Sequence, residues 1–370
     1  MRRILVLKPF LLTKANGGEI ALLERLKLFQ IWGVQTKVVI ALSDMEQPYL
    51  EPILSKFGAP SPRWLARGRA SYLLEGIECE VKFSPEFHAF DTQSQIPVER
   101  FFQEEMARFE PDLVITHYTD FFATTAALLW DAQRTWVDQT DDEYPRFNQL
   151  KDFPTLADRY KLITHFIVAS DFMKRSLSIS FPSSQIHYLP NIIESLKSDE
   201  RTPIHEYNPS SQSPWVFINP TAVKGVDFTI QLAREMPEHN FLFVGNWSTQ
   251  MPSDLPQNVQ TIERQNDLRS ILKSARGLLM PSVWNEAFGR MPLEAMAQGI
   301  PVIASNRGAL PDTVGSGGIC LPLETSLWKR ALSQDINTWR QLVRKGFDRV
   351  KSYQNEADEV YTELKQTWNL

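Results

Sequence analysis

Short apolar runs alternate along this chain with longer stretches whose apolar residues recur at helical spacing. In the first half, the runs predicted to be strands are 4–7, 37–41, 79–83, 112–116, 134–137, 166–169 and 186–189. Most of them are continuously apolar, which is typical of strands covered on both faces. Residues 19–32 show helical spacing and are predicted to form a helix. This alternation predicts an α/β fold with a doubly wound parallel sheet.

The segment 194–214 interrupts the alternation, because it is rich in Ser, Pro, Glu and Asp and poor in apolar residues. Such a composition indicates a connection between domains. Beyond it the predicted strands are 215–219, 241–244, 259–262, 277–280, 301–304 and 318–321, followed by a helical pattern over 339–370. We therefore predict an N-terminal domain over 1–195, a linker over 196–214, a second domain over 215–340 and a C-terminal helix over 341–370 that packs back on the first domain.

Composition narrows the possible classes of protein. A length of 370 residues favours two domains, and a net charge of −5 argues against a duplex-DNA binder, so no nucleic-acid partner is expected. The cysteines, Cys79 and Cys320, lie too far apart to form a metal-binding Cys-x-x-Cys pair and fit a reducing cytosol. The basic start precedes only four apolar residues, too few for a secretory signal, so a cytoplasmic location is expected.

The segment 281–304 carries the densest functional signal. Glu286 and Glu294 are separated by seven residues, and a helix is predicted to open near Gly289 and to end at Gly299. Free backbone N–H groups at such a helix start can bind a phosphate. Taken singly, Glu286 is also compatible with a dipole-stabilised helix-start acid, and Glu294 with a solvated helix carboxylate.

The order and spacing of this segment resemble the E-x7-E signature of retaining GT-B glycosyltransferases, the family-4-like or group 1 enzymes. The resemblance implies the GT-B fold, two Rossmann-like domains facing a cleft, with a nucleotide-sugar donor held mainly by the C-terminal domain. It implies that Glu286 binds hydroxyls of the donor sugar and that Glu294 accepts hydrogen bonds from the ribose. The donor would be a UDP- or GDP-sugar, and no metal or other cofactor would be required.

The same resemblance assigns the residues between these two glutamates. Phe288 and Gly289 would offer backbone N–H groups near the sugar. Arg290 and Met291 would lie by the diphosphate. Amide groups at a helix start and a guanidinium are chemically suited to oxyanions.

Lys224 follows the predicted strand 215–219 and can neutralise a diphosphate as a point charge. In the family an Arg stands five residues before this Lys, whereas here the position is Asn219. One cation is therefore missing, so Asn219 would contact the donor without a charge and Arg290 or Arg264 would assist Lys224. A surface lysine beside a turn glycine is the alternative for Lys224.

Five residues on other loops are also expected near the donor. Gly17 and Gly18 precede the first helix and permit close approach of the backbone, although no G-x-G-x-x-G motif is present. His117 follows a predicted strand, and the resemblance implies a hydrogen bond from it to the donor sugar. Gly245 resembles a loop glycine near the nucleotide, with Arg264 flanking the base. A plain turn and a structural histidine are the alternatives.

Two loops suggest other partners. The acidic run 138–143 contains hard oxygen ligands that could suggest a metal site, but the resemblance implies none, which leaves acceptor hydroxyls or a solvated loop. The stretch 62–69 mixes cations with a tryptophan and is compatible with peripheral membrane contact, an anionic acceptor or a solvated loop.

The sequence therefore predicts a retaining glycosyltransferase that moves a sugar from a nucleoside diphosphate to a hydroxyl of a carbohydrate or glycolipid acceptor. Glu286, Lys224 and His117 are the predicted catalytic residues, and no protein base or covalent nucleophile is named. The alternative is a non-catalytic protein of the same fold that binds nucleotide-sugars or acts as a scaffold, for which Asn219 is the best argument. A nicotinamide-dependent oxidoreductase lacks its glycine fingerprint.

Overall fold

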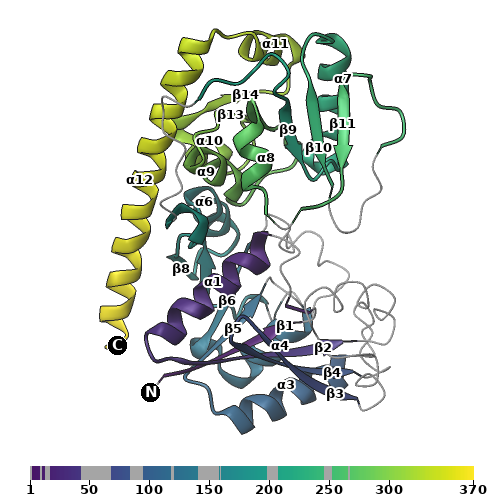
Figure 1. The fold of residues 1–370 in the computed structure, drawn as a ribbon. Coiled ribbons are helices and arrows are strands. Elements are labelled where there is room, and N and C mark those ends of the chain that lie inside the picture. Colours follow the sequence, from purple (N-terminus) through teal and green to yellow (C-terminus); the bar gives the residue numbers. More distant parts are fainter. Residues whose placement is uncertain are drawn as a thin grey trace. The chain divides into compact units, whose positions relative to one another are not determined.

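The computed structural model describes residues 2–8, 11–12, 17–42, 68–83, 95–117, 121–140, 158, 160–197, 207–245, 252–265 and 267–370. The chain divides into two units, each built around one sheet (Figure 1). Unit 1 comprises Met1–Ala169, Lys174–Ile192 and Tyr361–Leu370, and unit 2 comprises Ser170–Met173 and Ile193–Val360. The structure has the doubly wound α/β architecture that the sequence predicts.

Unit 1 holds an eight-stranded sheet in the order β3-β4-β2-β1-β5-β6-β7-β8. Its strands are β1 (Arg3–Lys8), β2 (Gln35–Leu42), β3 (Arg69–Leu74), β4 (Ile77–Phe83), β5 (Leu113–His117), β6 (Thr135–Asp138), β7 (His165–Val168) and β8 (Gln185–Tyr188). Its helices are α1 (Gly17–Ile31), α3 (Gln95–Phe109), α4 (Phe121–Asp131), the short η4 (Ala132–Arg134) and most of α6 (Asp171–Ser180). The strand order reverses between β1 and β5, which is where ligands bind in sheets of this type.

The edge strand β3 is absent from the sequence prediction and is antiparallel to β4, whereas the other neighbouring strands of this sheet are parallel. Glu75 and Gly76 join the two strands, both with positive φ, 49° and 87°. Positive φ at both central residues is the requirement of the tight type I′ hairpin turn. The first sheet is therefore mixed at one edge rather than wholly parallel.

The core of unit 1 follows from the alternation of side chains along the central strands. Leu5 and Leu7 of β1 pack with Phe101, Phe102 and neighbouring residues of α3 and α4 on one face of the sheet. The helix α1 covers the opposite face (Figure 1). Both faces of β1 are consequently buried, which explains its uninterrupted apolar run.

Unit 2 holds a six-stranded parallel sheet in the order β11-β10-β9-β12-β13-β14. Its strands are β9 (Trp215–Ile218), β10 (Phe241–Val244), β11 (Val259–Ile262), β12 (Gly277–Met280), β13 (Val302–Ser305) and β14 (Ile319–Leu321). Its helices are α7 (Val226–Glu235), α8 (Arg269–Ser274), α9 (Arg290–Ala297), α10 (Leu310–Val314), α11 (Thr325–Leu332) and α12 (Ile336–Thr367), with the short helices η6 (Glu194–Lys197), η8 (Ala222–Lys224) and η9 (Gly315–Gly317). The order reverses between β9 and β12.

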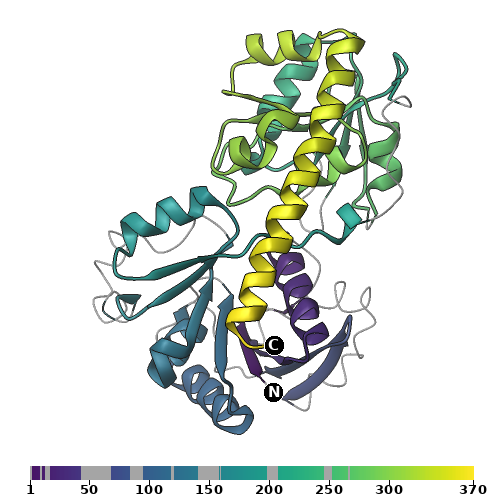
Figure 2. The same cartoon turned by 90° about the vertical axis from the view of Figure 1, so that its left-hand side faces the viewer.

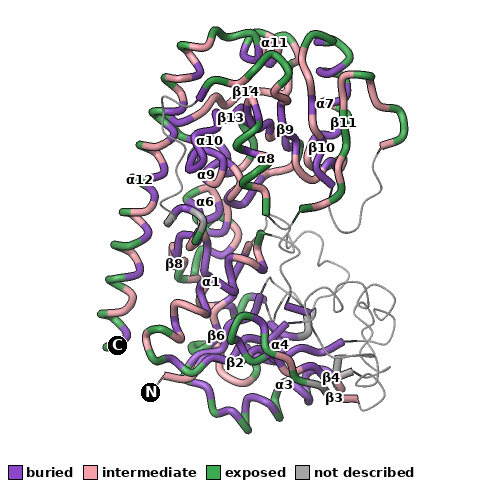
Figure 3. The backbone as a smooth tube through the Cα atoms, in the orientation of Figure 1, coloured by how far each residue is buried: buried purple, intermediate pink, exposed green. Residues whose placement is uncertain are grey.

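Aromatic side chains fill the core of unit 2 against one face of this sheet. Trp215 lies edge-on to Trp339 with ring centroids 5.3 Å apart, and Phe217 lies edge-on to Phe243 at 5.2 Å. Such tilted pairs add to the stabilisation from burial. Figure 3 shows the central strands β1, β2, β9 and β12 as buried segments, whereas the strands β8, β11 and β14 at or near the sheet edges are half-buried or exposed.

The helix α12 begins in unit 2 and ends in unit 1 (Figure 2). Trp339 is buried in the core of unit 2, whereas Tyr361 and Trp368 pack within unit 1. The Tyr361 hydroxyl donates to the Pro190 carbonyl at 2.8 Å, and the Trp368 ring lies 5.1 Å from that of Phe29. In the portion of the chain that the structure describes, no helix is both long and apolar enough to cross a membrane.

Candidate functional site

Three loops at the carboxyl edge of the unit 2 sheet hold and support Lys224 and Glu286, two of the predicted catalytic residues. They follow β9, β12 and β13, which are neighbours in the sheet, and the first two flank the reversal of strand order. The loop after β9 carries Lys224, the loop after β12 carries Glu286, and the loop after β13 carries Gly308. The topology therefore explains why residues far apart in sequence meet here.

Backbone contacts hold the loop after β9 against the loop after β12. The Val283 amide donates to the Val223 carbonyl at 3.0 Å. Gly225 has φ 88°, and a Cβ at this position would lie 2.0 Å from the Pro281 carbonyl oxygen. Glycine is thus required beside Lys224 both by its conformation and by the close approach of the neighbouring chain.

The loop after β13 fixes the backbone of Glu286. Gly308 has φ 59°, and a Cβ there would lie 2.3 Å from the Glu286 carbonyl oxygen. The Ala309 amide donates to that same oxygen at 2.7 Å. On the other side, the Ser305 hydroxyl donates to the Ser282 carbonyl at 2.7 Å. The carboxylate of Glu286 therefore projects from a rigid support.

Lys224 and Glu286 form an ion pair, with the ammonium nitrogen 2.6 Å from Oε1 of the carboxylate. The Ser282 hydroxyl donates to the same oxygen at 2.5 Å. The Lys224 ammonium also lies over the ring of Trp284, 4.8 Å from its centroid. The Glu286 side chain is 8% exposed and that of Lys224 is 21% exposed, so the pair is shielded but reachable from solvent. Sequence reasoning found the two charged residues but not Ser282 or Trp284.

The helix α9 starts directly after this loop, with Gly289 as its N-cap at φ 79°. A glycine N-cap offers no side chain to the amides of the first turn. The Phe288 carbonyl accepts from the Thr313 hydroxyl at 2.5 Å, which anchors the residue before the cap. Arg290 and Glu294 pair with each other at 3.4 Å, and Met291 is half-buried beside them.

Asn219, Gly245 and Arg264 follow β9, β10 and β11 at the same edge of the sheet. The backbone of Asn219 lies in the left-handed region, with φ 62°, a conformation that asparagine tolerates better than most residues. Its amide donates to the Val244 carbonyl at 2.8 Å, and that of Gly245 donates to the Ile262 carbonyl at 2.9 Å. Both loops are thus extensions of the sheet.

The residues predicted in the N-terminal half lie in unit 1. Gly17 and Gly18 are the first two residues of α1, so the expectation that they precede the helix is wrong by two residues. His117 is the last residue of β5 rather than the residue after it, and its side chain is fully buried. Both features lie beside the reversal of strand order between β1 and β5.

A cluster of buried charges surrounds His117. Its Nδ1 lies 3.5 Å from Oδ2 of Asp138, and the Arg25 guanidinium donates to that oxygen at 2.8 Å. Arg25 also donates to the Tyr361 hydroxyl at 3.3 Å. Lys8 pairs with Glu19 at 3.8 Å in the same region. The signal for Arg25 was its place on the apolar stripe of α1, one helical turn from both Leu22 and Phe29.

Burial and the neighbouring charges together set the protonation states of His117 and Asp138. Burial, with a smaller contribution from the Lys8 ammonium, lowers the pKa of the His117 imidazole from 6.5 to about 4, against the opposing influence of Asp138. Burial alone would raise the pKa of Asp138, but Arg25 and His117 together lower it below its ordinary 3.8. At neutral pH the cluster thus holds a neutral imidazole beside a charged carboxylate.

Two predicted loops fall partly outside the described residues. These are 141–143 of the acidic run and 62–67 of the cationic stretch. Among the residues that the structure does describe, no three His, Cys, Asp or Glu side chains come together as a metal-binding group.

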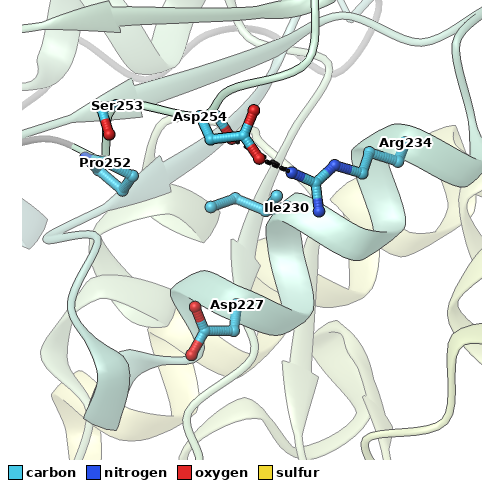
Figure 4. A pocket seen from close by; sticks show the side chains of 6 residues that line it. All are labelled: Asp227, Ile230, Arg234, Pro252, Ser253 and Asp254. Carbon is cyan, nitrogen blue, oxygen red and sulfur yellow. Dashed lines mark hydrogen bonds and ion pairs between the residues drawn. The ribbon is translucent and has the colours of Figure 1, made fainter.

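A cavity of about 420 Å³ lies elsewhere in unit 2, between α7 and the segment 252–254 (Figure 4). Asp227, Ile230, Arg234 and Asp254 are among its lining residues. The Arg234 guanidinium is already paired with Asp254 at 2.5 Å, as Figure 4 shows. None of the predicted donor-binding residues lines this cavity, so we assign it no role.

Part of the chain is similar in sequence to known glycosyltransferases. Residues 220–339 match the family model described as glycosyl transferases group 1. The chain is 34% identical over 94 residues to the alpha-1,3/1,6-mannosyltransferase alg-2 of Neurospora crassa, which covers 23% of this chain and 20% of that protein. It is 44% identical over 59 residues to the MMP alpha-(1->4)-mannosyltransferase of Mycolicibacterium hassiacum, covering 16% of this chain and 14% of that protein. The aligned segments thus span a fifth or less of these relatives.

Solved structures resemble the whole chain. The sucrose-phosphate synthase of Thermosynechococcus elongatus superposes with a TM-score of 0.69 at 16% identity, covering 100% of both chains. Alr3699/HepE of Anabaena in complex with UDP-glucose gives 0.66 at 16% identity, covering 99% of this chain and 100% of that one. At such low identity the likeness shows the fold. The chain has the GT-B fold, and its residues 220–339, which include Lys224, Glu286 and Glu294, form a domain of the glycosyl transferases group 1 family.

Proposed function

We propose that this chain is a retaining glycosyltransferase that transfers a sugar from a UDP- or GDP-sugar to a hydroxyl of a carbohydrate or glycolipid acceptor. The family match over 220–339 and the mannosyltransferase relatives support the reaction class. Alr3699/HepE of Anabaena, which has the same fold, has been solved in complex with UDP and with UDP-glucose, which supports a nucleotide-sugar donor. Retention is proposed from the resemblance of 281–304 to the E-x7-E signature.

The observation that carries the proposal is the Lys224–Glu286 pair between the carboxyl ends of β9 and β12, directly before the start of α9. A nucleotide-sugar needs a cation for its diphosphate and a hydrogen-bond acceptor for its sugar hydroxyls. Lys224 supplies the first and Glu286 the second, and the amides at the start of α9 add donors for oxyanions.

The chemistry follows from where charge develops. The bond between the anomeric carbon and the diphosphate oxygen breaks, and its electrons leave with the diphosphate. Lys224, Arg290 and the first turn of α9 stabilise that growing negative charge. The acceptor oxygen forms the new bond on the same face of the sugar, and its proton passes to the departing phosphate oxygen. Glu286 and Glu294 bind sugar and ribose hydroxyls and do not act as the paired carboxylates of a glycosidase.

The remaining predicted residues complete the donor site in this proposal. Phe288, Gly289 and Met291 lie around α9, while Asn219, Gly245 and Arg264 lie at the edge of the same sheet. The resemblance implies sugar and phosphate contacts for Gly17, Gly18 and His117 of unit 1, and of these the His117 side chain is fully buried in this structure. We also propose a cytoplasmic location, with membrane contact through 62–69 if the acceptor is a glycolipid.

One observation favours a second candidate, a non-catalytic protein that binds nucleotide-sugars. Asn219 stands where the family has an Arg, so the diphosphate would lose one cation. Transfer activity separates the candidates, because both predict nucleotide binding but only the first predicts turnover.

A thermal-shift screen of UDP, GDP, ADP and their sugar conjugates, with and without EDTA, tests the donor site. A ligand that binds only the folded state raises the melting temperature by mass action. We expect one nucleotide to give a shift that EDTA does not change and that Glu286→Gln reduces for the sugar conjugate. Glu235→Gln is the matched control, since Glu235 also pairs with a lysine in unit 2, at 3.3 Å from Lys329. No shift with any nucleotide in folded protein would contradict the proposal.

A further inference from the structure

Trp284 differs from the other described tryptophans of unit 2 in whether its indole N–H has a hydrogen-bond acceptor. Those other indoles donate hydrogen bonds: Trp215 to His239 Nδ1 at 3.4 Å, Trp328 to the Pro322 carbonyl at 2.9 Å and Trp339 to the Gln334 carbonyl at 3.0 Å. The Trp284 N–H is buried and has no acceptor within the described structure. Leaving a buried donor unsatisfied is destabilising, so the position calls for a physical reason.

The surroundings of Trp284 suggest that reason. Its backbone amide donates to the Val223 carbonyl at 3.3 Å, which ties it to the loop that carries Lys224. The face of its ring supports the Lys224 ammonium at 4.8 Å. It stands two residues before Glu286, at the centre of the proposed donor site. Trp284 is therefore held in place beside the group that is expected to receive the diphosphate.

A second polar atom, in the turn that carries Lys224, shows the same feature. Thr221 is the N-cap of η8, yet its hydroxyl makes no capping hydrogen bond. That hydroxyl oxygen is buried and has no hydrogen-bond partner in the residues that the structure describes. The Lys224 amide donates to the Thr221 carbonyl at 3.1 Å, so the two residues belong to one tight turn. A threonine at an N-cap usually satisfies a helix amide, which makes this hydroxyl the exception.

We propose that Trp284 and Thr221 are donor-binding residues whose N–H and O–H groups hydrogen-bond to oxygens of the diphosphate beside Lys224. The inference rests on the proposed function and extends it to two residues outside the family signature. A diphosphate presents several anionic oxygens, and a hydrogen bond with one charged partner is about twice as strong as a neutral one. In this chain an Asn, Asn219, stands where the family has an Arg. Two neutral donors thus offset the loss of that positive charge.

Isothermal titration of the full chain tests this assignment. The probes are the nucleoside diphosphate that raises the melting temperature, its sugar conjugate and inorganic pyrophosphate. Trp284→Phe keeps the ring face under Lys224 and removes only the N–H, and Thr221→Val keeps the shape and removes the hydroxyl. We expect Trp284→Phe to weaken the diphosphate and its sugar conjugate by the same factor, roughly tenfold, and Thr221→Val to weaken both by roughly threefold to tenfold.

Trp328→Phe is the matched control, because it removes the indole N–H of another buried tryptophan of unit 2, one that already donates to the Pro322 carbonyl. It should lower the melting temperature without changing any Kd. Wild-type affinity in folded Trp284→Phe and Thr221→Val would overturn the inference and leave the proposed function intact. Weakening confined to the sugar conjugate would overturn the diphosphate assignment. If the wild type binds neither the nucleotides nor pyrophosphate, the proposed function fails as well.

Discussion

The two units place charged side chains at equivalent points of their sheets, but in opposite environments. In unit 1 the reversal of strand order lies beside Lys8, His117 and Asp138, which are at most 1% exposed. In unit 2 it lies beside Lys224, which is 21% exposed, and Glu286, which is 8% exposed. Unit 1 thus encloses its charges, whereas unit 2 keeps a cation within reach of solvent.

The partners of these charges differ in the same way. In unit 1 the Asp138 carboxylate accepts a hydrogen bond from the Arg25 guanidinium at 2.8 Å, and its Oδ2 lies 3.5 Å from Nδ1 of His117. In unit 2 the Lys224 ammonium lies over the Trp284 ring. The Trp284 N–H and the hydroxyl of Thr221, which belongs to the same turn as Lys224, are buried and have no partner in the described structure. Internally satisfied buried charges mainly hold a structure in one arrangement, whereas a reachable cation with spare donors is suited to an anionic ligand. We therefore expect changes in unit 1 to act on stability first and changes in unit 2 to act on donor binding and turnover first.

Lys224→Met should give the largest functional effect. Removing a charge that stabilises the leaving diphosphate should lower kcat/KM by roughly 10²–10³-fold, the range seen when one transition-state contact is lost. Steady-state kinetics with the identified donor measure this loss. Lys329→Met, which breaks the Glu235 pair of the same unit, serves as the control and should stay within threefold of wild type. If kcat/KM of Lys224→Met also stays within threefold of wild type, the contrast between a structural cluster in unit 1 and a donor site in unit 2 is wrong.

Arg25→Met should give the largest effect on stability. It leaves the buried Asp138 carboxylate without its guanidinium, a loss that costs about 3–5 kcal/mol for buried pairs. Chemical denaturation measures the free energy of unfolding. Arg134→Met removes a guanidinium that is half-exposed in its pair with Asp131 and should cost less than about 1 kcal/mol. Equal losses in the two variants would show that the unit 1 cluster is not the closed network described above.

Acid should destabilise the protein through His117 before it protonates Asp138. The folded state holds the pKa of His117 at about 4 against 6.5 as its ordinary value. The unfolded chain therefore binds the proton more readily, and stability is lost as the pH falls from about 6.5 toward 4. The shift corresponds to a loss of about 3 kcal/mol. Asp138, whose pKa is below 3.8, adds its loss only at lower pH.

Denaturation curves between pH 7 and pH 4.5 measure this dependence. His117→Gln should remove much of the slope, because glutamine does not titrate. His239→Gln is a control from unit 2, where burial lowers the pKa of a half-buried histidine, and it should remove less. An unchanged slope in His117→Gln would place the acid sensitivity elsewhere.

Asn219→Arg should give the smallest effect and tests why the family arginine is absent. Asn219 has φ 62°, a region in which most side chains cost about 1–2 kcal/mol. We therefore expect arginine to lower the free energy of unfolding by about 1 kcal/mol, with Asn219→Gly close to wild type. The midpoint of denaturation measures both variants. If the arginine variant is as stable as wild type, backbone conformation does not explain why asparagine stands at position 219.

The sheets were predictable because buried parallel strands form short continuous apolar runs. Each predicted strand lies within two residues of the observed one. The strand β3 was missed because it is an edge strand. Its local signal in the sequence is the Glu75–Gly76 pair, which forms the turn to β4 with two positive φ values. Lys224 and Glu286 were found through motif spacing. Arg25 was not predicted, and its only signal in the sequence is a charged residue on the apolar stripe of a helix.

The contacts that give these residues their properties were not predictable from the sequence. Lys224 and Glu286 are 62 positions apart, and Arg25 and Asp138 are 113 apart. Composition and periodicity carry no information on which such side chains meet. The same holds for the missing acceptor of Trp284, since an unsatisfied donor is visible only when its surroundings are known.

The most direct test of the account is the rate of sugar transfer, or of donor hydrolysis without acceptor, for wild type, Glu286→Gln and Glu235→Gln. The donor is the nucleotide-sugar identified by thermal shift. The account predicts turnover by wild type and Glu235→Gln and a loss of roughly 10²-fold or more in Glu286→Gln, with all three proteins equally folded. Full turnover by Glu286→Gln would contradict the assignment of this loop as the donor site.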